Sequence, residues 1–212
     1  MTVPGTFDTS ARELIHAGLQ NLDEARSLFR QLSASGFDAA RCGLLLDALQ
    51  HVCDPDVALR NLVDIVNAQV SQGRALDDIM PDDTAFRQLV AVLGVSDAMG
   101  KLMRFRPDLV QAAATDHCNS HLYNHDQRRA HVLESVGADP NDRMSPTATM
   151  DLADAATALR RTYRNQLAAI IAQDTMSDDP IALQPRISSE LSDLADAALE
   201  GALAIARHEI TG

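Results

Sequence analysis

Potential metal ligands recur at helical spacing in one segment of the sequence. His117, His121 and His125 are each four residues apart, so a continuous helix would present three imidazoles on one face. Three such ligands with an open coordination position suit a catalytic zinc ion. Because the surrounding Asn and Ser residues favour turns, and no Glu occupies the place of a zinc-protease base, a solvated helix or loop is the alternative. Three further potential ligands lie close by: Asp116, Cys118 and His131.

Closely spaced aspartates are a second arrangement that could do chemistry. The pairs are Asp54 and Asp56, Asp77 and Asp78, Asp82 and Asp83, and Asp178 and Asp179. A two-metal nucleotidyl-transfer site uses such carboxylates to hold Mg²⁺ between substrate phosphates, but it needs them on a strand beside a Gly-rich turn. Here each pair begins an expected helix, where a carboxylate caps free amides and favours the positive end of the helix dipole. We therefore interpret these acids as caps or solvated loop residues.

Several arginines could form a surface for an anionic partner. They are Arg104, Arg106, Arg128, Arg129, Arg160, Arg161 and Arg164. We expect those of the last two helices to be used internally, as partly exposed ion pairs that orient one helix against the other. The expected pairs join Arg160, Arg161 and Arg164 to Asp193, Asp196 and Glu200.

Composition narrows the class of protein to which the chain can belong. With 212 residues and 46% hydrophobic residues, the chain can bury a sizeable core. Aromatic residues make up only 3% and Trp is absent, while Ala and Leu dominate, which favours closely packed helices. The formal net charge of -12 opposes a role as a nucleic-acid binder.

The cysteines and the apolar runs indicate the compartment. Cys42, Cys53 and Cys118 are three in number and follow no secretory signal, so we expect reduced thiols and a cytoplasmic protein. Cys118 is interpreted as a small, buried or half-buried residue and not as a nucleophile, since no base partner is evident in the sequence. No apolar run approaches the roughly 20 residues of a membrane span, so no membrane association is expected.

Helical periodicity runs through the whole sequence and predicts an all-α fold. We expect an irregular bundle of about eight to ten helices that ends in two long antiparallel helices. Residues 1–145 are predicted to form a bundle of short helices, and residues 146–212 the long pair. The long helices are expected over residues 150–174 and 188–207, separated by a break at 177–180 and by Pro185.

The final long helix is predicted to have two apolar stripes. The stripe expected to be buried consists of Ile187, Leu191, Leu194, Ala198, Ala202 and Ile205. A second stripe is expected to be left partly exposed: Leu199, Leu203, Ala206 and Ile210. This helix contains no group that performs chemistry, so it is interpreted as a scaffold.

Four motifs in one order carry a resemblance to a known family. The segment 89–109 contains Leu-Gly-x-Ser and a Pro-Asp-Leu turn, 136–140 reads Val-Gly-Ala-Asp-Pro, and 159–164 reads Leu-Arg-Arg-Thr-Tyr-Arg. The last motif is Glu-Leu-Ser-Asp-Leu-Ala-Asp-Ala-Ala-Leu-Glu at 190–200. Together they resemble the N-terminal helical region of the bacterial, especially actinobacterial, bifunctional glutamine synthetase adenylyltransferase/adenylyl-removing enzyme. The resemblance covers roughly residues 54–210; Ala169 and Gln173 stand where the family has basic residues.

This resemblance implies a catalytic function for the parent enzyme, but it does not imply one for this chain by itself. The family's Asn-Tyr-x-Ser-Asp-x-Asp motif is absent, so no catalytic, cofactor-binding or metal-binding residue can be assigned. The chain is expected to be an N-terminal fragment that precedes a nucleotidyltransferase domain. For the parent, the resemblance implies ATP and Mg²⁺ for adenylylation and phosphate-dependent removal of AMP. It implies the following catalytic domain, glutamine synthetase and a PII-type nitrogen-signalling protein as partners.

Two other classes of function remain open from the sequence. The first is a stand-alone helical interaction module, such as an irregular α-solenoid adaptor, because helix pairs at this spacing can stack without a fixed repeat. The second is a metalloenzyme whose ligands are His117, His121 and His125. A reading frame that continues into a Gly-rich, Asp-x-Asp-bearing segment favours the family, and bound metal favours the metalloenzyme.

Overall fold

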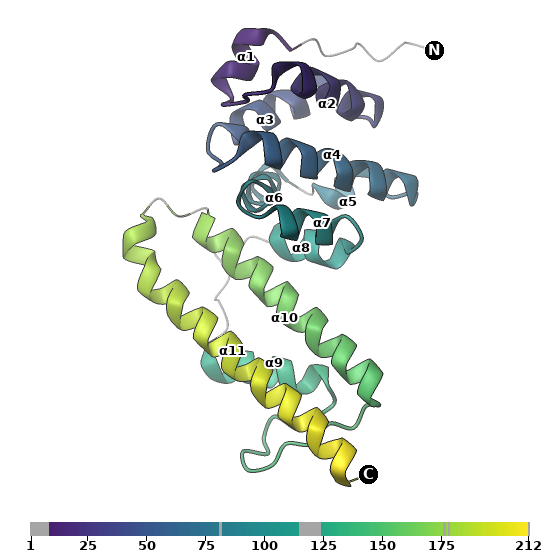
Figure 1. Ribbon diagram of the computed structural model, residues 1–212, viewed down its shortest axis with the longest axis vertical. Coiled ribbons are helices and arrows are strands. Elements are labelled where there is room, and N and C mark those ends of the chain that lie inside the picture. The colour runs from purple at the N-terminus through teal and green to yellow at the C-terminus, as the bar shows by residue number, and fades with distance from the viewer. Residues whose placement is uncertain (1–8, 81, 115–123, 176, 178, 212) are drawn as a thin grey trace. The chain divides into compact units, whose positions relative to one another are not determined.

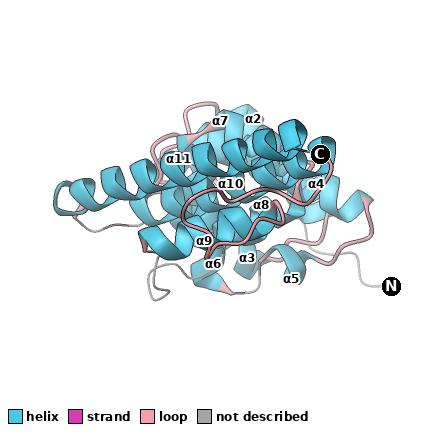
Figure 2. Ribbon diagram, turned by 90° about the horizontal axis from the view of Figure 1, so that it is seen from below, coloured by secondary structure: helices cyan, strands magenta, loops and turns pink. Residues whose placement is uncertain are grey.

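The computed structural model describes residues 9–80, 82–114, 124–175, 177 and 179–211, and these form helices and loops without a strand (Figure 2). Contacts within the chain divide it into two compact units, unit 1 (Met1–Asp116) and unit 2 (His117–Gly212). The all-α prediction is confirmed. The described residues form eleven helices, one of which is the four-residue α5 in a segment expected to be a loop. No described helix is both long and apolar enough to span a bilayer.

The described residues of unit 1 form eight helices that stack largely in chain order (Figure 1). They are α1 (Ala11–His16), α2 (Leu22–Ala34), α3 (Ala39–Leu49), α4 (Pro55–Ser71), α5 (Leu76–Ile79), α6 (Asp83–Val95), α7 (Asp97–Met103) and α8 (Pro107–Ala114). Their starts follow the sequence signals: Ser10 and Glu13 form a capping box, and Asp54 caps α4 ahead of Pro55. Helix α4 packs on α2, α6 and α7, and so lies at the centre of the unit.

The core of unit 1 is built from large apolar side chains. Phe29 and Phe86 are fully buried, and the ring centroids of Phe37 and Phe86 lie 6.3 Å apart. Helix α7 crosses α4 closely, because Gly100 lies against Asn61, whose Nδ2 donates to the carbonyl of residue 93 over 3.2 Å. A Cβ at Gly100 would lie 2.3 Å from the Asn61 side chain, so glycine is required for this approach.

Unit 2 consists of three described helices: α9 (His125–Ser135), α10 (Leu152–Thr175) and α11 (Pro180–Thr211). The two long helices run antiparallel side by side, as predicted, and α9 packs against both (Figure 1). Sequence analysis placed α9 with the bundle of short helices by dividing the chain at residue 145. In the structure the units meet at residue 116, because the buried residues Arg128, Val132 and Leu133 of α9 share contacts with the long pair.

The expected break at Pro185 is wrong. Helix α11 begins at Pro180 and continues through Pro185. Asp179 caps it, since its Oδ1 accepts from the N–H of Ala182 over 3.0 Å. Pro185 removes the hydrogen bond to the carbonyl of Ile181 in the second turn, and Ile181 is 88% exposed, so water can replace the missing donor.

Candidate functional site

Most of the expected metal-binding segment lies outside the described residues, including Asp116, His117, Cys118 and His121. His125 begins α9, and its Nδ1 lies 3.0 Å from Oδ1 of Asp193 on α11. His131 lies on the same helix, with Nδ1 3.3 Å from Nε2 of Gln166. Within the described ranges no three His, Cys, Asp or Glu residues are grouped in a way that could hold a metal ion.

Five of the paired aspartates whose side chains are described cap helices, tie a loop or form an ion pair: Asp54, Asp56, Asp77, Asp82 and Asp179. Asp54 and Asp82 accept from backbone N–H groups at the starts of α4 and α6 over 3.0 and 2.8 Å. Asp56 accepts from the N–H groups of residues 20 and 21, which ties the loop after α1 to α4. Asp77 pairs with Arg41 of α3. These acids therefore serve structure, as the helix-start positions predicted.

The expected pairing of Arg160, Arg161 and Arg164 with the final helix is wrong for two of the three acids. Asp193 pairs with His125, and Glu200 pairs with Arg129, so both acids are engaged by α9. The reason is geometric: α9 lies across α11, and its first two turns bring these side chains to the acidic positions.

A buried polar centre joins the three helices of unit 2. Arg128 is 1% exposed; its Nη1 donates to Oε1 of Gln166 over 2.8 Å, and its Nη2 donates to Oε2 of Glu190. Glu190 is also approached by Arg186 at 3.6 Å. Sequence analysis missed this centre. A signal existed, because Glu190 falls three residues after Ile187 and four before Leu194, on the buried side of α11.

Arg129 fixes the loop between α9 and α10 onto α11. Its Nε and Nη2 donate to the two carboxylate oxygens of Glu200 over 2.7 and 2.6 Å. The same guanidinium donates to the carbonyls of Pro140 and Asp142 over 2.6 and 3.0 Å. The N–H groups of Ser145 and Met144 donate to Asp142 and lower the pKa of its carboxyl group. The loop is therefore held by charge-assisted hydrogen bonds.

Helix α11 has a buried side and an exposed apolar side. The buried side contains Ile187, Glu190, Leu194, Ala197, Gly201, Ala204 and Ile205. The prediction that Leu191 and Ala202 belong to it is wrong: Leu191 is 42% exposed and Ala202 is exposed. Contacts with α9 and α10 turn the helix so that position 190 faces inward in place of position 191. The expected exposure of the second stripe is confirmed: Leu199 70%, Leu203 49%, Ile210 84%, with Ala206 also exposed.

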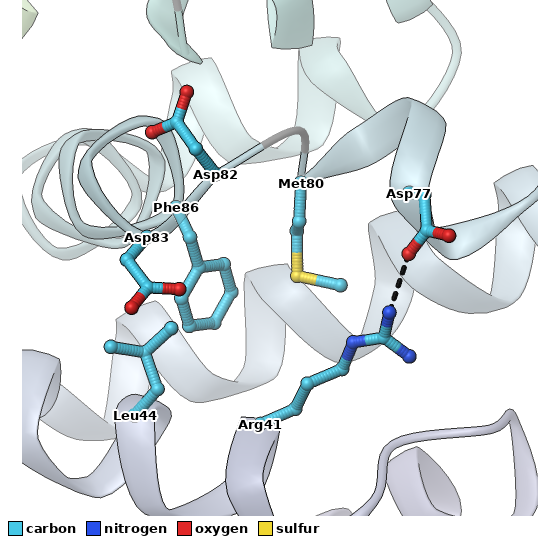
Figure 3. Close-up of a pocket in the computed structure, with 7 residues that line it drawn as sticks. All are labelled: Arg41, Leu44, Asp77, Met80, Asp82, Asp83 and Phe86. Carbon is cyan, nitrogen blue, oxygen red and sulfur yellow. Dashed lines mark hydrogen bonds and ion pairs between the residues drawn. The ribbon is translucent and has the colours of Figure 1, made fainter.

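One pocket of unit 1, of about 200 Å³, lies between α3, α5 and α6 (Figure 3). It is lined by Arg41, Leu44, Asp77, Met80, Asp82, Asp83 and Phe86. The Arg41–Asp77 ion pair lies along one side, and Asp82 is engaged as the cap of α6. The described lining offers no hydroxyl, thiol or imidazole, and two of its three carboxylates are engaged, Asp77 by Arg41 and Asp82 as the cap.

Comparison with known proteins gives one consistent result. The chain is 65% identical over 97% of its length to the N-terminal part of a protein of Bifidobacterium longum (strain DJO10A), described as bifunctional glutamine synthetase adenylyltransferase/adenylyl-removing enzyme. Proteins of the same description from Leifsonia xyli and Cutibacterium acnes are 30% and 28% identical over 94% and 92% of the chain. The chain spans 19% of the length of each of these curated relatives. No family model and no solved structure matches the chain.

The resemblance inferred from the four motifs is therefore confirmed, and it extends over nearly the whole chain. It reaches beyond the roughly 54–210 range that the motifs covered, because the first helices also align.

Proposed function

We propose that this chain is a helical scaffold region of the enzyme that attaches AMP to glutamine synthetase and removes it, and that it holds no group that performs the transfer. The observation that carries the proposal is the 65% identity over 97% of the chain to the N-terminal part of proteins so described. The described side chains support the non-catalytic part. Asp54 and Asp82 cap helices, and Arg128 and Arg129 pair with Glu190 and Glu200, so these charged groups are used in helix starts and helix contacts.

In this proposal the chemistry belongs to the part of the polypeptide outside the aligned fifth. That part would bind ATP and Mg²⁺ for adenylylation and phosphate for the reverse reaction. Glutamine synthetase is the substrate, a PII-type nitrogen-signalling protein is the regulatory partner, and the enzyme acts in the cytoplasm in nitrogen regulation. The contribution of this chain is to hold its helices in a fixed arrangement beside the catalytic domain.

The test compares two proteins prepared in parallel, the 212-residue chain and the full polypeptide encoded by its gene. Each is incubated with glutamine synthetase, Mg²⁺ and ATP labelled in the α-phosphate. We expect label on glutamine synthetase with the full polypeptide and none with the 212-residue chain. Omission of Mg²⁺ is the control and should abolish labelling.

Two results would overturn parts of the proposal separately. Labelling by the 212-residue chain alone would refute its non-catalytic role. Absence of labelling by an intact full polypeptide would refute the family function.

A second candidate is a stand-alone interaction module, which the in-order stacking of α1 to α8 favours. This candidate predicts a reading frame without a nucleotidyltransferase segment, and sequencing of the locus decides between the two.

A further inference from the structure

The exposed apolar side of α11 is continuous over about five helical turns. Seven residues, called the outer stripe from here on, lie on one side of the helix: Leu191, Ala195, Leu199, Ala202, Leu203, Ala206 and Ile210. All seven are exposed, and Leu199 and Ile210 are exposed to 70% and 84%. Single exposed apolar residues need no explanation, but a continuous apolar stripe marks an interaction surface.

The other side of α11 shows that unit 2 does not need the outer stripe for its own core. Its two described clusters are small, and the first is rich in Ala: Leu133, Val136, Ala138, Ala148, Ala155, Ala204 and Ile205. The second is Ile170, Ile187 and Leu194. Both use the inner side of α11, and the Arg128–Glu190 ion pair lies on that side as well. The outer stripe is therefore apolar surface in excess of what the three helices bury.

The composition of the outer stripe specifies the kind of partner. Leu191, Leu199 and Leu203 are large anchors, whereas Ala195 and Ala202 leave room for another backbone to approach. Large and small residues that alternate along a helix are suited to a second helix with the opposite pattern. Asp196 and Glu209 are exposed next to the stripe, so basic residues at the edges of that second helix complement it.

We infer that the outer stripe is the docking surface for an apolar helix of the polypeptide that follows α11 in the full-length enzyme. The inference rests on the proposed function. The relatives match this chain over their N-terminal part, which is only 19% of their length, so about four-fifths of their polypeptide follows the aligned region. A segment tethered to the C-terminal end of α11 has a millimolar effective concentration at the stripe. A second copy of the chain lacks this advantage.

The experiment places a photo-crosslinker in the outer stripe of the full-length polypeptide. Leu199 is replaced by p-benzoylphenylalanine, which its 70% exposure accommodates, and Leu203 is replaced in a second variant. The control carries the same group at Met144, which is 89% exposed and lies in the loop between α9 and α10. After irradiation, the crosslinked peptides are identified by mass spectrometry.

We expect both stripe variants to crosslink within one chain to peptides that follow residue 212, and the Met144 variant to form no such crosslink. Crosslinks to residues 9–114 would assign the stripe to unit 1, and crosslinks that double the mass would assign it to a second copy; either overturns the inference. Absence of crosslinks at both positions overturns it as well. The AMP-transfer assay on the same preparations tests the proposed function separately. AMP transfer without crosslinks would refute the docking surface and leave the proposed function standing.

Discussion

The two units of this chain bury different kinds of side chain. In unit 1 the largest fully buried side chains are apolar, among them Phe29, Phe86 and Leu89. In unit 2 the largest is the charged Arg128, surrounded by Gln166 and Glu190. Unit 1 therefore gains its stability from apolar burial, whereas unit 2 is oriented by an ion network and by close contacts of small residues.

Removal of Arg128 should have the largest effect. Arg128→Ala leaves Glu190 buried without its main partner, and we expect a loss of about 3–5 kcal/mol. Hydrogen exchange should accelerate in α9, α10 and α11 and stay unchanged in α4 and α6 of unit 1. The matched control replaces all three polar partners, Arg128→Met with Gln166→Leu and Glu190→Leu, and should recover most of the stability. Equal losses in the single and triple variants would contradict an uncompensated charge as the cause.

Truncation of a core side chain in unit 1 comes next. Leu89→Ala removes a fully buried side chain of α6, and we expect a loss of about 2–5 kcal/mol from the lost burial and the cavity. Urea unfolding followed by circular dichroism measures it. Val95→Ala on the same helix is the control, since Val95 is 48% exposed, and its effect should stay within about 0.5 kcal/mol. Similar values for the two variants would refute the described core.

A pair of glycines tests the close contacts of unit 2. A Cβ at Gly201 would lie 2.9 Å from Cγ1 of Val132 and 3.0 Å from Cδ1 of Leu159, so Gly201→Ala should cost about 1–3 kcal/mol. Gly43 of α3 has open space around it, and Gly43→Ala should stabilise the helix by about 0.5–1 kcal/mol. The midpoint of thermal unfolding should therefore fall in Gly201→Ala and rise in Gly43→Ala. A stabilising Gly201→Ala would show that α9, α10 and α11 pack less closely than described.

The smallest expected effect is a difference in reactivity between two thiols, those of Cys42 and Cys53. Burial raises the pKa of Cys42 to about 11, whereas Cys53 is exposed. In a Cys118→Ser background at pH 8, a thiol reagent should modify Cys53 rapidly and Cys42 only after unfolding. Because the folded-state pKa is raised, the stability linked to Cys42 is present below the ordinary thiol pKa of about 8.5 and is lost as pH rises toward 11. Rapid reaction of both thiols would contradict the burial of Cys42.

Local signals in the sequence predicted much of the fold. The capping box at Ser10, the Asp54–Pro55 start and the long antiparallel pair are as expected, because short-range patterns determine them. The pairing of charges was not predictable in the same way. Which acids of α11 face Arg128 and Arg129 depends on how α9 crosses the long helices, and that crossing is a tertiary property.

The inner side of α11 also depends on tertiary contacts that the sequence pattern does not determine. The 3.6-residue period allowed Leu191 on the buried side, but a rotation of the helix by one position brings Glu190 inward and leaves Leu191 42% exposed. Judged by apolar periodicity alone, Leu191 is predicted to be buried and Glu190 exposed. The partner Arg128, from another helix, makes the buried Glu favourable, and such a partner cannot be read from the period of α11.

Hydrogen exchange at residues 191–210 tests the central claim most directly, namely that α11 is a scaffold helix whose outer stripe serves the rest of the enzyme. Exchange is measured by mass spectrometry for the 212-residue chain and for the full-length polypeptide under the same conditions. We predict slower exchange of these amides in the full-length polypeptide, with the difference removed by Leu199→Gln and Leu203→Gln together. Equal exchange in the two proteins would contradict the account.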